Sequence, residues 1–173
     1  MEHDYRYEYY GVRIRPMTHE DIELLRTWRN NTQNSQYLRK IPHITAEMQE
    51  KWYSSYLEDK NIIMFMIDID DPTPKTVGSI SLYHLDGEDS LELGKVLIGD
   101  ADSHNKSIGT RAVIAATSVA IEQLSKNKVY LHVNKKNFAA VKTYKRAGFV
   151  VGESFSEDEV VMKYMGQNGK EGN

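Results

Sequence analysis

The chain has 173 residues, a formal net charge of −3 at pH 7 and no cysteine. This length predicts one domain with a sizeable core, and the mildly acidic balance gives no electrostatic reason to expect a nucleic-acid partner. The lack of cysteine excludes disulfides, thiolate metal sites and a cysteine nucleophile. No apolar run approaches the ~20 residues of a membrane span, and the first residues do not form a signal peptide. We therefore expect a cytoplasmic protein with no membrane partner.

The N-terminal part of the chain predicts a strand followed by two helices. Residues 1–11 are polar and tyrosine-rich, and we expect an arm or an edge strand. Residues 12–15 alternate in polarity, which favours a half-buried strand. Thr18 and Thr45 are suitable N-caps for the two helices. Three large residues recur every four positions in the second helix and predict its buried stripe: Met48, Trp52 and Tyr56.

The remainder of the chain alternates short apolar runs with two helical segments. The expected strands are 62–67, 76–85, 90–98, 128–133, 149–155 and 159–165, and the expected helices begin at 108 and 138. This order predicts a mixed α/β sheet, mostly antiparallel, with helices on both faces and a parallel crossover across 91–133. We expect residues 12–165 to form a single domain and residues 166–173 to form a disordered tail.

Residues 105–110, Asn-Lys-Ser-Ile-Gly-Thr, form a turn that opens an apolar helix. The first N–H groups of a helix have no internal partner and lie at the positive end of its dipole, so they can hold phosphates. Ser107 and Gly109 are small enough to let a pyrophosphate approach, and Lys106 and Arg111 add positive charge nearby. The same segment is also typical of an ordinary capped helix, and the turn alone leaves both interpretations open.

A second segment places an amide and a phenol on one helix face. Asn137 and Tyr144 lie seven residues apart, which brings them to the same stripe, and Gly148 follows where the helix should end. Tyr144 is a candidate proton donor, and Asn137 stands where an N-cap is expected. The alternative is structural, with Asn137 as a cap only and Tyr144 as a partly buried core residue.

Together these segments resemble the Gcn5-related N-acetyltransferase (GNAT) superfamily. Residues 137–149 match in full the family pattern Asn-x-x-Ala-x-x-x-Tyr-x-x-x-Gly-Phe. Residues 104–109 resemble the phosphate signature Gln/Arg-x-x-Gly-x-Gly/Ala, with His104 in place of Gln/Arg and Ser107 in place of glycine. Ser107 fits this position if its backbone keeps φ below zero. The resemblance covers nearly the whole chain and implies the GNAT fold, with acetyl-CoA as donor and an amine as acceptor.

Residues 13–18 and 28–30 resemble the branch that holds ribosomal-protein, spermidine, aminoglycoside and nucleotide-sugar amine acetyltransferases. Within that branch we favour a small amine, such as an amino sugar or a nucleotide-linked amino sugar. The alternatives are a protein N-terminus, spermidine, an aminoglycoside, or a coenzyme-A-binding sensor that has lost catalysis. By analogy with the fold, the protein is expected to be a monomer or a homodimer.

The resemblance also implies roles for particular residues. Tyr144 is the expected acid for the coenzyme A sulfur, and Glu92 is the expected base, with His84 as its rival. Glu92 is equally interpreted as an outward-facing strand carboxylate. The strand over 92–98 is expected to separate from its neighbour, so that a backbone N–H near Val96 polarises the carbonyl. The expected cofactor contacts are Val96, Leu97, Ile98, His104, Asn105, Lys106, Ser107, Ile108, Gly109, Thr110, Asn137, Ala140 and Tyr144.

Acceptor contacts are expected from the first two helices and the loop between them. The candidates are Trp28, Arg29, Tyr37, Trp52 and His84. Both tryptophans stand at core spacing, whereas Arg29 flanks the stripe and is suited to hold a carboxylate or phosphate bidentately.

The histidines show no metal-ligand spacing, so no metal is expected. His132 is expected to be a strand residue that bonds a backbone group.

Overall fold

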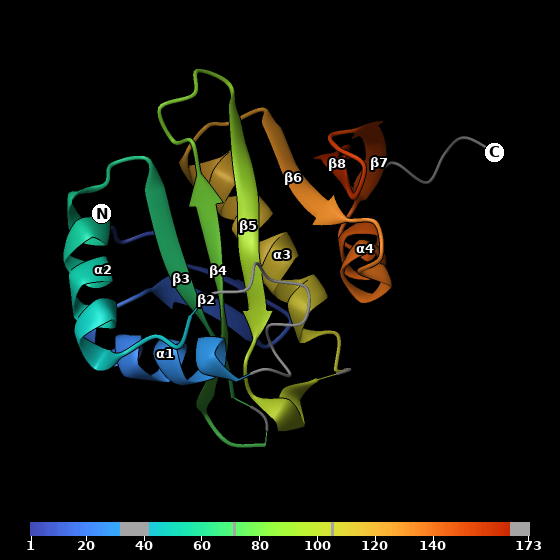
Figure 1. Cartoon of the computed structure of the whole chain (residues 1–173). Helices are drawn as coiled ribbons and strands as arrows, with labels where there is room; N and C mark the ends of the chain where they lie inside the picture. Colours follow the sequence, from blue (N-terminus) through green and yellow to red (C-terminus); the bar gives the residue numbers. More distant parts are fainter. Residues whose placement is uncertain (32–41, 71, 105, 167–173) are drawn as a thin grey trace.

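The computed structural model describes residues 1–31, 42–70, 72–104 and 106–166. Its centre is one eight-stranded sheet with the order β1-β2-β3-β4-β5-β6-β8-β7 (Figure 1). The strands are β1 Tyr7–Tyr9, β2 Val12–Pro16, β3 Ile62–Ile69, β4 Lys75–Tyr83, β5 Ser90–Ile98, β6 Lys128–Asn134, β7 Phe149–Ser154 and β8 Glu159–Tyr164. β5 and β6 are parallel, and the other neighbouring pairs are antiparallel. The predicted mixed, mostly antiparallel sheet is confirmed.

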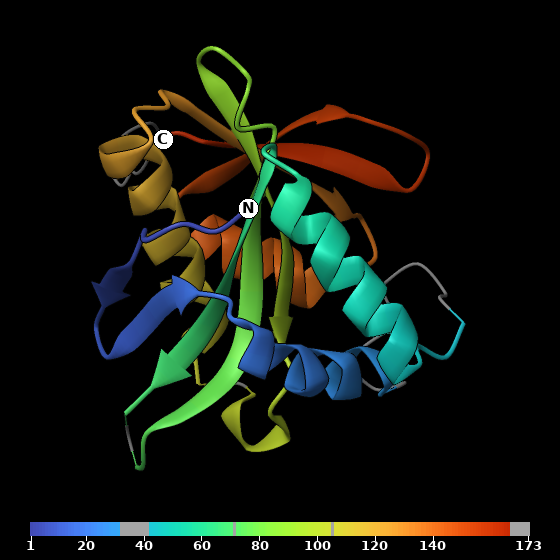
Figure 2. The ribbon, with the colours of Figure 1, turned by 90° about the vertical axis from the view of Figure 1, so that its left-hand side faces the viewer.

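The helices lie on both faces of this sheet. They are α1 Ile22–Asn30, α2 Ala46–Glu58, α3 Ile108–Ser118 and α4 Phe138–Arg146, with short 3-10 turns at His19–Asp21 and Ala101–Ser103. α3 continues into a π-helical turn, Val119–Gln123. Figure 2 shows α1 and α2 on one side of the sheet and α3 on the other. α4 packs beside α3 and against β7.

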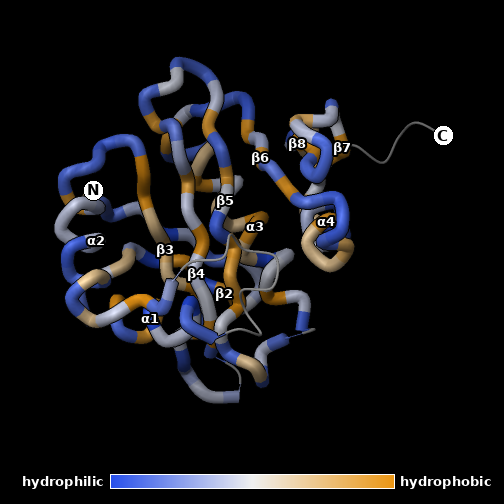
Figure 3. Tube along the Cα trace, viewed as in Figure 1, coloured by the Kyte–Doolittle hydropathy of each residue, from blue (hydrophilic) through white to orange (hydrophobic). Residues whose placement is uncertain are grey.

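Each face of the sheet has its own apolar core. On the α3 face, residues such as Leu91, Leu93 and Ala112 are fully buried, and on the other face Trp28 and Tyr56 pack with β3. Figure 3 shows the apolar residues along the central strands and α3. Residues that alternate along β4 and β5 therefore face two different environments, one beneath α3 and one beneath α1 and α2.

The buried stripe of α2 differs from the predicted one. Tyr56 is buried as expected, but Met48 is 45% exposed, and Gln49 and Tyr53 are buried in its place. Tyr53 packs edge-on against the ring of His19, which belongs to the turn before α1. The helix is thus rotated by about one residue, because its contact with α1 and the preceding turn selects the inner face, and local spacing carries no information about that contact.

A buried ion-pair network fixes α1 to the sheet. Arg15 on β2 donates two hydrogen bonds to the Asp21 carboxylate, at 2.7 and 2.8 Å, and a third to Asp68 on β3 at 2.9 Å. Burial alone raises the pKa of Asp21, but hydrogen bonds from Arg15 and Thr18 outweigh it and hold the pKa below its usual value. The paired charges stabilise the start of α1 at neutral pH.

The turn between β1 and β2 is tied to the start of α3. Tyr10 and Gly11 both have positive φ, 47° and 72°, as a two-residue hairpin loop of type I′ requires. The Arg111 guanidinium on α3 donates to the Tyr10 carbonyl at 2.6 Å and to the Lys106 carbonyl at 2.9 Å. The edge hairpin therefore supports the turn that precedes α3.

The end of α1 rests directly on the end of β5. A Cβ atom added at Gly99 would lie 2.1 Å from Cδ2 of Trp28, well inside the distance of real contacts. Trp28 itself is only 7% exposed. The glycine thus lets α1 approach the sheet closely at the position where β5 ends.

We predict that Gly99→Ala lowers the free energy of unfolding by about 1–3 kcal/mol, because the methyl group forces the Trp28 ring and α1 away from β5. Urea titration followed by circular dichroism measures the change. Gly109→Ala is the matched control, because its Cβ would meet Thr143 and Ile98 only at 3.6 and 3.9 Å. Alanine favours the helix there, so the control should be at least as stable as the wild type. Equal stability of the two variants would contradict the prediction.

Candidate active site

The site is built where the sheet divides. β5 and β6 share three residue pairs: Ser90–Lys128, Leu91–Val129 and Glu92–Tyr130. Beyond Glu92, β5 continues with β4 while β6 turns toward β8, and the two strands diverge in Figure 1. The expected separation over 92–98 is confirmed. Where β5 and β6 diverge, their facing N–H and C=O groups do not bond to each other. They are available to an extended ligand with amide groups.

A β-bulge lies within the divergent part of β5. Ser79 pairs with Leu97 and Ser81 with Gly94, so β5 contains one residue more than β4 over this interval. Lys95 adopts left-handed backbone angles, with φ 49°. A bulge takes a residue out of the regular ladder and re-aims its peptide groups. An N–H near Val96 stays our predicted contact for the thioester carbonyl.

Glu92 stands at the point of divergence and lies between two histidines. Its Oε1 is 3.0 Å from Nδ1 of His132 on β6, and its Oε2 is 3.5 Å from Nε2 of His84. The side chains of Glu92 and His132 are only 22% and 23% exposed, whereas that of His84 is 60% exposed. The prediction that His132 bonds a backbone group is wrong, since its partner is this carboxylate. The pair forms because Glu92 and His132 share one face of the sheet beside its division.

Tyr144 on α4 is a protonated phenol in an apolar surrounding. The residue is 8% exposed and packs against Phe149, with ring centroids 6.2 Å apart. Burial raises the pKa of Tyr144 to about 12. Within the described residues its hydroxyl has no hydrogen-bond partner. The side chain therefore keeps its proton at neutral pH and can donate it.

Asn137 caps α4 as predicted. Its Oδ1 accepts a hydrogen bond from the Ala140 N–H at 3.1 Å. The amide Nδ2 of Asn137 has no partner among the residues that the structure describes. The cap leaves this donor available to a ligand at the start of α4, so capping and cofactor contact are compatible.

The turn before α3 presents backbone donors. Among the described residues, the first N–H of α3 to bond a backbone carbonyl is that of Arg111, which donates to Ser107 at 3.2 Å. The N–H groups of Ile108, Gly109 and Thr110 precede this bond and point out of the helix end. Ser107 itself does not cap the helix with its side chain. The chemistry of this donor set suits a phosphate group.

Ser107 does not meet the condition under which serine fits this position without cost. Its φ is 58° and its ψ 15°, which is the left-handed region that glycine favours. The backbone is left-handed because the chain must reverse here to enter α3. Serine thus stands where the family pattern has glycine, and the backbone at this position is still left-handed.

His104 belongs to the loop rather than to the helix end. Its Nε2 is 2.8 Å from the carbonyl oxygen of Ile98, the last residue of β5. The N–H groups of Gly99 and Asp100 both donate to Val77 on β4, at 2.9 and 3.2 Å. These contacts fix the loop to the end of the sheet. Asn105 lies outside the described residues.

The first turn of α3 lies beside α4 and the end of β5. A Cβ added at Gly109 would point toward Thr143 and Ile98 at ordinary van der Waals distance. In Figure 1 the start of α3, the end of β5 and α4, which bears Tyr144, lie in the same region of the molecule. The residues present therefore fit acetyl-CoA, whose phosphates would lie against α3 and whose amide arm would lie along β5.

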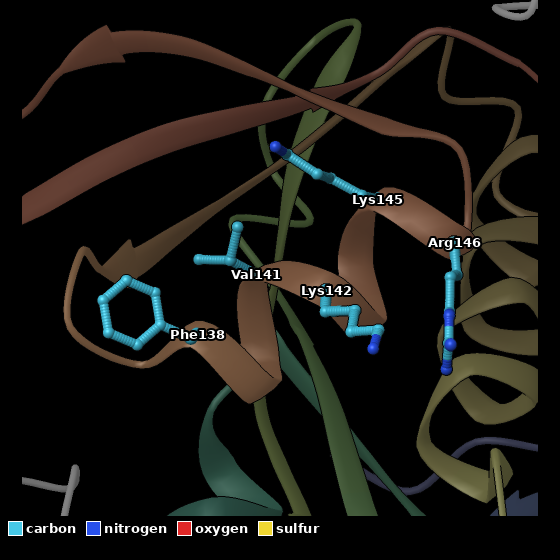
Figure 4. Close-up of a pocket in the computed structure, with 5 residues that line it drawn as sticks. All are labelled: Phe138, Val141, Lys142, Lys145 and Arg146. Carbon is cyan, nitrogen blue, oxygen red and sulfur yellow. The ribbon is translucent and has the colours of Figure 1, made fainter.

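A shallow hollow of about 530 Å³ lies on the outer face of α4. Figure 4 shows its lining residues along the helix: Phe138, Val141, Lys142, Lys145 and Arg146. The Phe138 ring is 77% exposed. Sequence analysis did not single out this surface, although helical spacing of the three cations was a usable signal. Val141, which lines the hollow, stands one helical turn before Tyr144.

The predicted acceptor residues have different environments. Trp28 belongs to the core, and Trp52 is half-buried and stacked on Tyr56 with centroids 5.8 Å apart. Arg29 is half-buried and His84 is exposed. Tyr37 lies outside the described residues.

The comparison with known families decides the class of protein. The family described as an acetyltransferase (GNAT) domain matches residues 12–150. The chain belongs to this family. It is an acetyl-CoA-dependent N-acetyltransferase, as its family resemblance implied.

Relatives of this GNAT protein include enzymes of named activity. Spermidine N(1)-acetyltransferase of Escherichia coli K12 is 24% identical over 149 residues, which cover 86% of this chain and 78% of the relative. The spermidine N-acetyltransferase of Vibrio cholerae, solved with CoA and spermine, has a TM-score of 0.79 at 20% identity. The match covers 88% of this chain and 94% of the Vibrio cholerae chain. AAC(6')-Ib, solved with paromomycin and acetyl-CoA, has a TM-score of 0.74 at 19% identity, with coverages of 89% and 93%.

The GNAT structure also bears on membrane-spanning and metal-binding segments. Among the described residues no helix is long and apolar enough to cross a membrane. In the same part of the chain, no group of three or more His, Asp or Glu side chains is arranged to hold a metal ion.

We predict that Ser107→Gly raises the free energy of unfolding by about 0.5–1 kcal/mol, because glycine accepts the left-handed backbone without steric cost. Urea midpoints measure the change. Ser118→Gly is the control, since Ser118 has ordinary helical angles, φ −64° and ψ −41°. Glycine should lower stability there by up to about 1 kcal/mol. Destabilisation by both substitutions would show that Ser107 is not strained.

We predict that Gly109→Glu weakens coenzyme A binding by more than tenfold, because the new carboxylate would lie between α4 and β5 and repel the phosphates. Calorimetric titration with coenzyme A measures the affinity. The Gly109→Ala protein serves as the control for the loss of glycine. Unaltered affinity of the glutamate variant would place the phosphates elsewhere.

Proposed function

We propose that this N-acetyltransferase transfers the acetyl group directly to the primary amine of a small acceptor, an amino sugar or a nucleotide-linked amino sugar. The division of the sheet carries the proposal: it occurs immediately after Glu92, and the helix that bears Tyr144 lies beside the same division. A base for the amine and an acid for the thiol thus border one gap. Both substrates would be held together, which supplies the proximity that acyl transfer needs.

Each proposed residue handles a defined proton. Acetyl-CoA supplies the acetyl group as a reactive thioester. Glu92 accepts the proton of the amine, directly or through water, as the C–N bond forms. His132 holds the Glu92 carboxylate in place through its Nδ1. Tyr144 gives its proton to the sulfur as the C–S bond breaks, and its pKa of about 12 keeps that proton available.

Spermidine is the second candidate acceptor. The observation in its favour is the likeness to E. coli spermidine N(1)-acetyltransferase over 86% of this chain. A polyamine would need an acidic cleft, and Glu92, an acid of this face among the described residues, already has a histidine partner. A coenzyme-A-binding sensor without catalysis is disfavoured by the buried, protonated Tyr144.

We predict that Tyr144→Phe and Glu92→Gln each lower kcat by about 10²–10⁴-fold, the usual scale of general acid and general base catalysis. Neither change should alter coenzyme A affinity by more than about twofold, since both residues act on protons rather than on phosphates. Thiol release at saturating substrates measures kcat, and calorimetry measures binding. Acceptors should span amino sugars, nucleotide-linked amino sugars, polyamines, aminoglycosides and short peptides.

Tyr164→Phe is the matched control for the phenol. Tyr164 lies on β8 and packs against Phe149, as Tyr144 does, but it belongs to a strand away from the gap. Its kcat should equal that of the wild type. Full activity of Tyr144→Phe, with chemistry shown to limit turnover, would remove the phenol from the mechanism. Thiol release with none of the amines, despite tight binding of acetyl-CoA, would favour the sensor.

A further inference from the structure

A group of polar side chains lies on the sheet face beneath α1 and α2, and acetyl transfer uses none of them. Ser81 and Tyr83 on β4 point to the same face as Glu92, and Tyr83 is the direct cross-strand partner of Glu92. Tyr83 packs against the apolar cluster that contains Trp28. Its ring also covers Gly94, where an added Cβ would lie 3.2 Å from Cε2.

Two buried hydroxyls in this group have no hydrogen-bond partner. They are Ser81 Oγ and Tyr83 Oη, and both atoms are shielded from solvent. Ser81 lies near Tyr83 and influences its ionisation, but neither oxygen makes a hydrogen bond of good geometry within the described residues. A buried hydroxyl without a partner costs about 1–3 kcal/mol, so such groups usually mark a functional position.

Two cations border the same hydroxyls. The Lys95 Nζ lies 5.0 Å from the centroid of the Tyr83 ring. Arg29 follows Trp28 at the end of α1 and makes no hydrogen bond or ion pair with any residue that the structure describes. By contrast, Arg13, Arg15 and Arg26 each hold a carboxylate. Arg29 is therefore half-buried, and its donors make no bond within the described part of the chain.

The two cations also disfavour one another. Desolvation, and after it the charge of Arg29, lowers the pKa of Lys95, and desolvation lowers the pKa of Arg29. Two acids face the cluster. Glu92 acts on Tyr83 across the strands and is already bonded by His132, and Asp59 acts on Lys95 only through its charge. An anion placed between the cations would remove their repulsion and gain both as partners.

We propose that Arg29, Lys95, Ser81 and Tyr83 bind an anionic group, a carboxylate or a phosphate, carried by the acceptor amine. The inference rests on the proposed function and names the acceptor class more narrowly. The amine lies at Glu92, and the anion lies on the Arg29 side of Tyr83. A polyamine, which carries only positive charge, is a poor occupant of this cleft.

Matched acceptor pairs test the proposal. Each pair is one amine with and without its anion: an amino acid and its amide, an amino-sugar phosphate and the free amino sugar, a nucleotide-linked amino sugar and its neutral glycoside. The anionic member should have a kcat/KM at least about tenfold higher, the value of one charge-assisted hydrogen bond. The pair with the larger ratio identifies carboxylate or phosphate as the group recognised.

Arg29→Gln and Lys95→Gln should each lower kcat/KM for the anionic member by about 10- to 100-fold, and the loss should appear as a higher KM. The kcat/KM of the neutral member and the KM of acetyl-CoA should change by no more than about twofold. Arg13→Gln is the control, because it removes the same charge at an exposed ion pair on β2. The inference would be overturned by equal losses for both members of a pair, or by faster turnover of spermidine than of every anionic amine. Neither result would contradict the acetyltransferase reaction itself.

A binding measurement separates failure of the inference from failure of the proposed function. Inorganic pyrophosphate is titrated by calorimetry into the protein saturated with coenzyme A, so that the phosphate turn is already filled. One further site, weakened at least tenfold by Arg29→Gln and not by Arg13→Gln, supports the anion cluster even if no tested amine is acetylated. No binding under these conditions, together with no preference among acceptor pairs, would overturn it.

Discussion

The interruption of the parallel ladder between β5 and β6 is the constraint on which the rest of the site depends. Parallel strands joined by a helical crossover usually pair along their length, whereas here the pairing ends after Glu92. Within the described residues β6 then pairs with β8 alone, and β5 keeps β4 through a bulge at Lys95. The backbone groups freed by this division no longer bond to the neighbouring strand. In the mechanism that we propose, cofactor and acceptor meet at this break in the sheet rather than on top of it.

The site also concentrates backbone strain. The described non-glycine residues with positive φ are Tyr10, His84, Lys95, Ser107 and Ser125. His84 lies against Glu92, Lys95 forms the bulge, and Ser107 precedes the helix for which we predict phosphate contacts. Each conformation costs on the order of 1 kcal/mol and persists because the surrounding contacts fix it. The ion pairs of Arg15 and the close contact of Trp28 with Gly99 hold the neighbouring elements in place while these residues remain strained.

Much of the fold could be predicted because its information is local. Alternation in β2, the Thr45 cap and the glycine after α4 are decided by a few neighbouring residues, and the Asn137–Tyr144 pattern needs only helical geometry. The contact of Glu92 with His132 joins residues 40 positions apart, and strand register sets it. The rotation of α2 depends on its packing against His19, and the left-handed Ser107 depends on where the loop must enter α3. The unpartnered hydroxyls of Ser81 and Tyr83 appear only once two strands and α1 are assembled.

The short seam at Glu92 has a mechanical consequence. Three residue pairs, with α3 and α4, join the strands β1–β5 to the strands β6, β8 and β7. Glu92 therefore lies at a short junction between two groups of strands, and a small displacement at this junction would change the separation of Glu92 from Tyr144. A ligand bound across the seam stiffens the whole molecule. Amide hydrogens on β6 that touch no ligand will then exchange more slowly. The exchange rate of this strand therefore reports whether a ligand is bound, although the strand itself does not contact it.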